Sequence, residues 1–383
     1  MAAIDLDRLD DADAIAALDA SDMLRAVASS AAQVRAAHTA TEEAALSALA
    51  FDARPRAVVV TGMGGSAIAG EALAAVAGVR CPVPVVVHRG YGLPGWVGAA
   101  DVVMAVSCSG TTAETLTAAA EAARRGARLL GVGAADSQLE SQCLAGGGRF
   151  VPVTTWLSPR SSFWTLAVPL LLAGHRFGLL DLGPDVGALE ATAASLESIA
   201  TMCGPDRESY TNPAKALAAE LAGSLPLIWG TGQLGPLAAA RLGAQIAENA
   251  KLPSVVGALP EAHHNQVVAF DGAMAGGRSE DDLFRDRVED EEPYRLRLVL
   301  VRDDDADEGA KKRAHISADL ASERGIRVSV LGAQGETTLE RLASLIATLD
   351  YASVYLALAY GVDPTPIAAI DELKRALAAP TYP

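Results

Sequence analysis

The chain contains 383 residues, of which 50% are apolar and 20% are charged. It can therefore bury a large core, and its length favours two or three domains. Its formal net charge is −16, and acidic residues gather in 279–292 and 303–308. This charge argues against nucleic acid and anionic membranes as partners. A phosphorylated ligand would need a local site built from helix N-termini and a few cations.

The four cysteines are too scattered for metal-ligand pairs and too few for a disulfide framework. They are Cys81, Cys108, Cys143 and Cys203. No basic N-terminal segment leads into an apolar core, and the apolar run at 166–174 is too short to span a bilayer. We therefore expect a cytoplasmic protein with reduced thiols.

The first half of the chain alternates helix and strand patterns. Apolar residues at helical spacing in 12–49 predict two or more helices before the first strand. A β-branched run at 57–60 is followed by a glycine-rich turn and a helix over 67–76 that ends at Gly78. Further strands are expected at 84–87, 102–106 and 127–133. This alternation predicts a mainly parallel sheet with helices on both faces.

A second cycle of the same kind follows the loop at Asn212-Pro213. We expect strands at 225–229, 296–301 and 327–331, and helices at 235–249 and 339–360. The order of strand, glycine turn and Ala-rich helix in 58–73 recurs in 226–242, which indicates an internal duplication. We predict an N-terminal helical segment (1–50), a first domain with a phosphate pocket (51–205), and a second domain with C-terminal helices (206–383).

The glycine-rich turn of the first domain has the sequence Gly62-Met63-Gly64-Gly65-Ser66. Glycines allow close approach of a ligand, and the first turn of the following helix offers free N–H groups to an anion. A dinucleotide fingerprint would need a third glycine where Ala67 stands, and a P-loop would need a Gly-Lys-Ser/Thr sequence. The turn is either an anion site or a tight connection.

A hydroxyl-rich loop follows the third strand, with the sequence Ser107-Cys108-Ser109-Gly110-Thr111-Thr112-Ala113-Glu114-Thr115. Its hydroxyls and backbone amides could donate to phosphate oxygens together. The alternative is an N-capping cluster, with Thr111 or Thr112 as the cap.

Together, the two motifs resemble those of the sugar isomerase (SIS) domain family. That resemblance implies two SIS-type α/β domains, each a mainly parallel sheet flanked by helices. The hydroxyl loop departs from the family pattern at Thr111, where asparagine is usual, and at Cys108, where an aromatic residue is common. The implied phosphate-binding residues are Gly64, Gly65, Ser66, Ser107, Ser109 and Thr112.

Further segments resemble the bifunctional phosphoglucose/phosphomannose isomerases within this family. They are Tyr91-Gly92-Leu93-Pro94, Ser158-Pro159-Arg160, 245–251 (QIAENAK), 260–265 (PEAHHN), 363–366 (DPTP) and Leu373-Lys374. The matching segments extend over roughly 23–377, which is nearly the whole chain.

The resemblance implies roles that suit aldose–ketose isomerisation. Glu248 would be the base that moves a proton between C1 and C2, and His264 the acid that opens the sugar ring. Arg160 would stabilise the enediolate charge, Lys374 would lie near the ring oxygen, and Thr365 would bind substrate. Taken singly, each has an ordinary alternative: a polar helix-face glutamate, a structural histidine, a helix-capping or surface-paired arginine, a solvated lysine.

The implied activity is an isomerase that interconverts glucose 6-phosphate and/or mannose 6-phosphate with fructose 6-phosphate through an enediol(ate). No residues have metal-ligand spacing, so we expect neither metal nor cofactor. The implied assembly is a homodimer in which His264 reaches the other subunit's site. The alternative function is a non-catalytic sugar-phosphate sensor. The aminotransferase branch of the family would need a cysteine at position 2, where the chain has Ala2.

Overall fold

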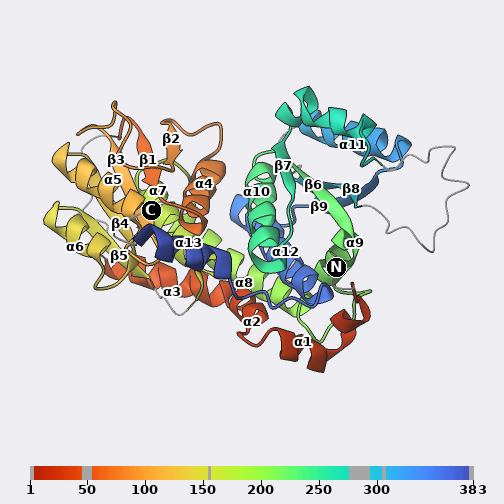
Figure 1. Ribbon diagram of the computed structural model, residues 1–383. Coiled ribbons are helices and arrows are strands. Elements are labelled where there is room, and N and C mark those ends of the chain that lie inside the picture. The colour runs from red at the N-terminus through yellow and green to blue at the C-terminus, as the bar shows by residue number, and fades with distance from the viewer. Residues whose placement is uncertain (1–3, 45–53, 154–156, 276–293, 304–307, 379–383) are drawn as a thin grey trace, which may run out of the picture.

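The chain forms two lobes, and each lobe is built on a sheet of parallel strands (Figure 1). The computed structural model describes residues 4–44, 54–153, 157–275, 294–303 and 308–378. The predicted α/β class with two SIS-type domains is confirmed. The acidic stretch 279–292 lies outside the described residues, as do four of the six residues of 303–308.

Short valine-rich runs form three of the five strands of the first sheet, because β-branched side chains suit the strands of a covered parallel sheet. All its strand pairs are parallel, in the order β2-β1-β3-β4-β5. The strands are β1 (Val58–Thr61), β2 (Val85–His88), β3 (Val102–Ser107), β4 (Arg128–Ala134) and β5 (Arg149–Val153).

Helices cover both faces of the first sheet. Val58 and Val60 face one apolar cluster with α3, α4 and α7, whereas Val59 and Val103 face another with α5 and α6. These helices are α3 (Ser30–Glu43), α4 (Gly65–Ala77), α5 (Ala113–Arg124), α6 (Gln138–Ala145) and α7 (Phe163–Arg176).

The second sheet has four strands in the order β7-β6-β8-β9, which repeats the order β2-β1-β3-β4 of the first sheet, again with parallel pairs. Its strands are β6 (Ser224–Thr231), β7 (Val255–Ala258), β8 (Arg295–Arg302) and β9 (Arg327–Gly332). One face packs on α9 (Pro213–Leu221), α10 (Gly235–Gln245) and α12 (Thr338–Ala359), and the other on α11 (Glu308–Glu323). The shared order supports the predicted duplication.

One apolar core runs through both lobes, because α8 (Gly187–Met202) packs against α3 on one side and α12 on the other. The N-terminal segment joins this core through η1 (Asp7–Asp10), α1 (Ala12–Leu18) and α2 (Met23–Ala28). It is fastened to the end of α12, since the Asp5 N–H donates to the Ala359 carbonyl at 2.9 Å and Arg8 Nη1 donates to the Leu358 carbonyl at 2.8 Å.

Helix α12 is long and apolar enough to cross a membrane by length and composition alone. An 18-residue window of it is entirely buried within the fold. It makes contacts with α8, α9 and α10, so its apolar character is accounted for by its place in the core.

Candidate active site

The two predicted phosphate motifs are neighbours at the carboxyl edge of the first sheet. Thr61 at the end of β1 pairs with Ala105 of β3, so the turn Gly62–Ser66 and the loop Ser107–Thr112 leave adjacent strands at nearly the same level. A Cβ added at Gly62 would lie 2.9 Å from the Val106 carbonyl oxygen. Glycine is therefore required for this contact between the strand ends.

The hydroxyls of the second motif face one another rather than the helix that follows. Ser107 Oγ lies 2.9 Å from Thr112 Oγ1 and 3.5 Å from Ser109 Oγ, and it accepts the Gly110 N–H at 3.1 Å. Thr112 is the N-cap residue of α5, yet its side chain caps no N–H of that helix. The capping interpretation therefore does not account for the cluster, and the positive end of α5 has no side-chain cap.

The glycine turn also contacts a segment from the end of the first domain. Helix α4 begins at Gly65, and its N-cap Gly64 has φ +51° and no side-chain cap. A Cβ at Gly65 would lie 2.9 Å from the Pro159 carbonyl oxygen. This close approach brings the predicted phosphate pocket against the short helix η3 (Pro159–Ser161), which carries Arg160.

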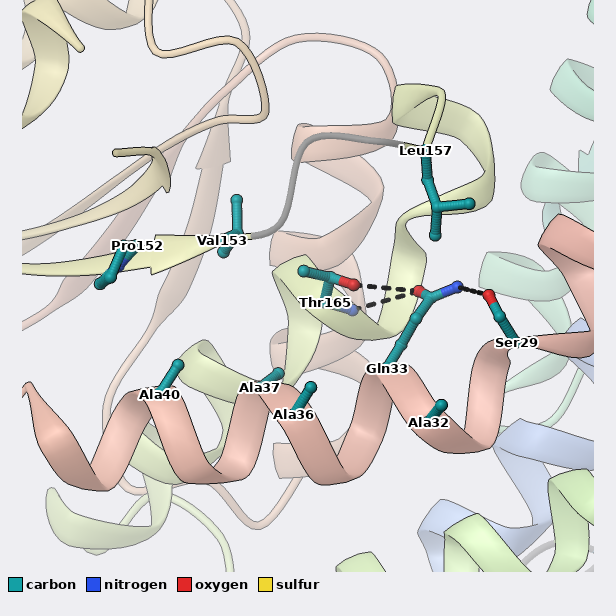
Figure 2. A pocket seen from close by; sticks show the side chains of 10 residues that line it. All are labelled: Ser29, Ala32, Gln33, Ala36, Ala37, Ala40, Pro152, Val153, Leu157 and Thr165. Carbon is teal, nitrogen blue, oxygen red and sulfur yellow. Dashed lines mark hydrogen bonds between the residues drawn. The ribbon is translucent and has the colours of Figure 1, made fainter. Parts of the chain in front are cut away.

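Helix α3 holds this short helix from the other side. The amide nitrogen of Gln33 donates to the Ser161 carbonyl at 2.8 Å, and its oxygen accepts from the Thr165 hydroxyl at 3.1 Å. Figure 2 shows Gln33 between Ser29 and Thr165, beside a cavity of about 130 Å³ whose other walls are mostly small apolar side chains. Because both ends of the Gln33 amide are bonded, we interpret Gln33 as a support for the Arg160 turn.

The buried Arg160 guanidinium is fixed by uncharged oxygens of the second domain. Its Nε donates to Asn249 Oδ1 at 2.8 Å, and its Nη2 donates to the carbonyls of Pro364 (2.8 Å) and Thr365 (2.7 Å). Its Nη1 lies 3.7 Å from Glu248 Oε2. Burial lowers the pKa of Arg160 from its usual range, while the Glu248 carboxylate acts in the opposite direction. Arginine keeps its charge at neutral pH despite such a shift.

Glu248 lies in a single π-type turn, η5 (Ile246–Ala250), that continues α10. Such turns widen a helix and often occur at functional sites. Lys251 ends the turn with φ +59°, and its Nζ donates to the Glu248 carbonyl at 2.6 Å and to the Pro364 carbonyl at 3.1 Å. The predicted helix over 235–249 is thus α10 followed by this turn. The Glu248 side chain is 31% exposed, which leaves its carboxylate accessible to a ligand.

Thr365 adds a hydroxyl without a partner to the same region. Its backbone N–H donates to Asp363 Oδ1 at 2.9 Å and its carbonyl accepts from Arg160, whereas its Oγ1 is buried and unbonded. An unpaired buried hydroxyl is costly unless a ligand or water satisfies it. The structure therefore brings together the glycine turn, the hydroxyl loop, Arg160, Glu248 and Thr365.

Two of the predicted site residues, His264 and Lys374, have no contact with Arg160, Glu248 or Thr365 among the described contacts of the single chain. His264 is exposed at the end of η6 (Glu261–His264), and its side chain has no hydrogen bond among the described residues. The adjacent His263 has the structural role instead, because its Nε2 bonds Ser317 Oγ at 2.7 Å and burial lowers its pKa. Lys374 is exposed on α13 (Ala368–Ala378), likewise without a bonded partner in the described part of the chain.

The segment that follows β8 in the second sheet differs in sequence from the hydroxyl loop that follows β3. A Cβ at Gly232 would approach the Asp303 carbonyl oxygen, just as one at Gly62 would approach that of Val106. The loop sequence from 303 to 307 is DDDAD and contains no hydroxyl, and the buried Asp303 pairs with Arg341 at 3.0 Å. The hydroxyl-rich sequence that follows β3 is therefore not repeated after β8.

No three His, Cys, Asp or Glu side chains among the described residues come together as a possible metal site.

The sequence matches known isomerases over most of its length. Residues 210–377 match the family model of the bacterial phospho-glucose isomerase C-terminal SIS domain. A bifunctional phosphoglucose/phosphomannose isomerase from Caldicellulosiruptor bescii is 32% identical over 323 residues, covering 84% of this chain and 89% of the relative. The chain belongs to the bifunctional phosphoglucose/phosphomannose isomerase family. A relative of the same name from Aquifex aeolicus is 29% identical and covers 86% of this chain and 93% of its own length.

Solved structures of low sequence identity share the fold. A hypothetical protein from Thermus thermophilus aligns with a TM-score of 0.67 at 15% identity, covering 98% of this chain and 95% of its own. The C-terminal domain of glucosamine-fructose-6-phosphate aminotransferase from Francisella tularensis aligns with a TM-score of 0.66 at 15% identity, covering 90% of this chain and 98% of its own.

Two residues of the site had no role assigned from the sequence. Asn249 holds the Arg160 side chain, and Lys251 shares the Pro364 carbonyl with it. Both lie in the segment 245–251, whose family resemblance had marked it as a unit. In the sequence Asn249 is only one of several polar residues in this segment; the structure shows that it is completely buried and therefore needs bonded partners.

Proposed function

We propose that this protein is an aldose–ketose isomerase that interconverts glucose 6-phosphate and/or mannose 6-phosphate with fructose 6-phosphate. The observation that carries the proposal is that an accessible carboxylate, Glu248, and a fixed guanidinium, Arg160, lie together next to the glycine turn, which in turn adjoins the hydroxyl loop Ser107–Thr112. The loop, Gly64, Gly65 and Ser66 would hold the phosphate, and Thr365 would meet a sugar hydroxyl. The names of the relatives support this substrate class.

The chemistry follows from the placement of the charges. Glu248 would remove the proton from one of C1 and C2 and return it to the other through an enediol(ate). The negative charge that develops on the oxygens would meet the Arg160 Nη1 donors, which make no hydrogen bond among the described residues. Because this cation is supplied by the chain, the proposed reaction needs no metal.

The ring-opening acid requires a second copy of the chain. We propose a homodimer in which the exposed His264 of each subunit reaches the partner's site, with Lys374 approaching the sugar from α13. Apolar side chains exposed near His264 support an interface there. They are Val255, Val256 and Val268.

A coupled assay of the purified protein with fructose, glucose and mannose 6-phosphates, in excess EDTA, tests the proposal. We expect turnover that chelation does not reduce, and deuterium from solvent at C2 of recovered glucose 6-phosphate. Activity that disappears in EDTA and returns with Zn²⁺ would refute the metal-free mechanism. Binding of the sugar phosphate without turnover or deuterium exchange would instead indicate the sensor.

A further inference from the structure

The Arg160 side chain is one link in a closed hydrogen-bonded ring of buried residues. Its Nε donates to Asn249 Oδ1, Asn249 Nδ2 donates to Ser353 Oγ at 2.8 Å, and Ser353 Oγ donates to the Asp350 carbonyl at 2.7 Å. The Asp350 carboxylate binds Arg241 at 2.8 and 2.6 Å, and Arg241 Nη2 returns to the Arg160 carbonyl at 2.8 Å. The ring therefore fixes both the backbone and the side chain of Arg160.

Asn249 is suited to its place in this ring by its chemistry. Arginine Nε can only donate, so the amide oxygen must face Arg160. The Ser353 hydroxyl donates its hydrogen to the Asp350 carbonyl, so toward Asn249 it can only accept, and the amide nitrogen must face it. An isosteric apolar side chain would satisfy neither partner, and a carboxylate would satisfy the one at Arg160.

Asn249 also adjoins Glu248 in the same π-type turn, and it is completely buried whereas Glu248 is 31% exposed. A side chain held by two hydrogen bonds thus anchors the backbone that carries the carboxylate and, at the same time, the guanidinium 3.7 Å from it. We infer that Asn249 is a positioning residue that sets the relative placement of Arg160 and Glu248. This inference rests on the proposed function, because it concerns the groups that would contact the reacting atoms.

Kinetics of matched variants test the inference. Asn249→Leu should lower kcat by about 10- to 100-fold and leave KM within about threefold, because misplacement of a catalytic group by about an ångström costs turnover on that scale. Asn249→Asp retains the acceptor for Arg160 Nε, but its carboxylate would partly neutralise the guanidinium, so this variant is compared by hydrogen exchange and not by kcat. Thr192→Val is the matched control, since Thr192 is buried and bonded at 2.6 Å to Ala188 outside the ring. It should keep the parental kcat.

A second measurement reports on the hydrogen bond from Arg160 Nε to Asn249 Oδ1 and does not depend on enzyme activity. In protein labelled with ¹⁵N-arginine, the Arg160 Nε–H resonance, assigned by its loss in Arg160→Lys, should exchange slowly with solvent. It should stay so in Asn249→Asp and Thr192→Val and exchange fast in Asn249→Leu. If Asn249→Leu does not fold, Ser353→Ala removes the support behind Asn249 and should lower kcat by several-fold with faster Nε–H exchange.

The inference is overturned if Asn249→Leu, or its substitute Ser353→Ala, keeps the parental kcat within twofold. It is equally overturned if Thr192→Val loses as much kcat as Asn249→Leu, or if the Arg160 Nε–H exchanges as fast in Asn249→Asp as in Asn249→Leu. A parent protein without turnover on any of the three sugar phosphates overturns the proposed function. In that case the Nε–H exchange rates still decide whether Asn249 fixes the guanidinium.

Discussion

Two buried arginines on facing segments differ in the partners of their guanidinium groups. Arg241 is held by the Asp350 carboxylate, which neutralises it. Arg160 is buried to the same degree, yet three of its N–H donors go to uncharged oxygens of Asn249, Pro364 and Thr365. An uncharged cage keeps the positive charge available to an anion that forms beside it. The partner set, rather than burial, therefore singles out Arg160.

Replacing Glu248 with glutamine tests the residue proposed as the base. The amide keeps the size of the side chain but cannot accept the proton, so kcat should fall by about 10²-fold or more with KM within a few-fold. Solvent deuterium should no longer enter C2 of glucose 6-phosphate. Glu190→Gln, an exposed glutamate that pairs with Arg35, is the control and should behave as the parent. Parental deuterium exchange in Glu248→Gln would assign the base to another group.

Family motifs in the sequence identified Glu248, Arg160 and Thr365 as parts of one site, and the fold places them together. The ring behind them could not be predicted. It depends on Asn249 and Ser353 facing each other from segments 104 residues apart, and nothing in either local pattern specifies that contact.

At the scale of elements, the site is built from turns that join rigid pieces of both domains. The strands β1 and β3 set the two phosphate motifs side by side, and Gly65 lets α4 start in contact with Pro159. The two strands that sequence patterns did not predict are the edge strands β5 and β7. Pro152 interrupts β5, and β7 contains only four residues with a glycine among them, so neither shows a clear strand pattern.

Gly65→Ala tests the contact between the glycine turn and the Arg160 helix. The new Cβ would lie 2.9 Å from the Pro159 carbonyl oxygen, so α4 and η3 must separate. We expect a several-fold rise in KM and a fall in kcat, because the phosphate pocket and Arg160 both move. Steady-state kinetics, with inorganic phosphate as a competing inhibitor, measure the two effects. Gly95→Ala meets no atom within 4 Å and serves as the control; equal kinetics for both variants would contradict the role of the contact.

At the scale of the whole molecule, the two sheets share one strand order but have diverged in chemistry. The first keeps hydroxyls at its carboxyl edge, whereas the equivalent loop of the second is rich in aspartate. Repeated sequence order predicted the duplication. The sequence could not predict the hydrogen bonds from Asp5 and Arg8 to the end of α12, because these bonds join parts of the chain about 350 residues apart.

The proposed dimer can be tested by mixing two inactive proteins. Glu248→Ala lacks the base and His264→Ala lacks the acid, so each homodimer should have little turnover. After subunit exchange, a mixed dimer would contain one site with both groups, and activity should return to about a quarter of the parental level at equal concentrations, from the statistics of random pairing. A parent that sediments as a fully active monomer would exclude the shared site.

The bonds from Asp5 and Arg8 to the end of α12 have a thermodynamic consequence. They tie the N-terminal segment to α12. Helix α8 joins the apolar cores of the two lobes into one. Unfolding of either lobe would therefore expose apolar surface of the other. Melting should therefore be shared between the lobes. Differential scanning calorimetry should show one endotherm for the parent, and Arg8→Ala should lower its midpoint without dividing it. Two resolved endotherms in the parent would mean that the lobes unfold independently.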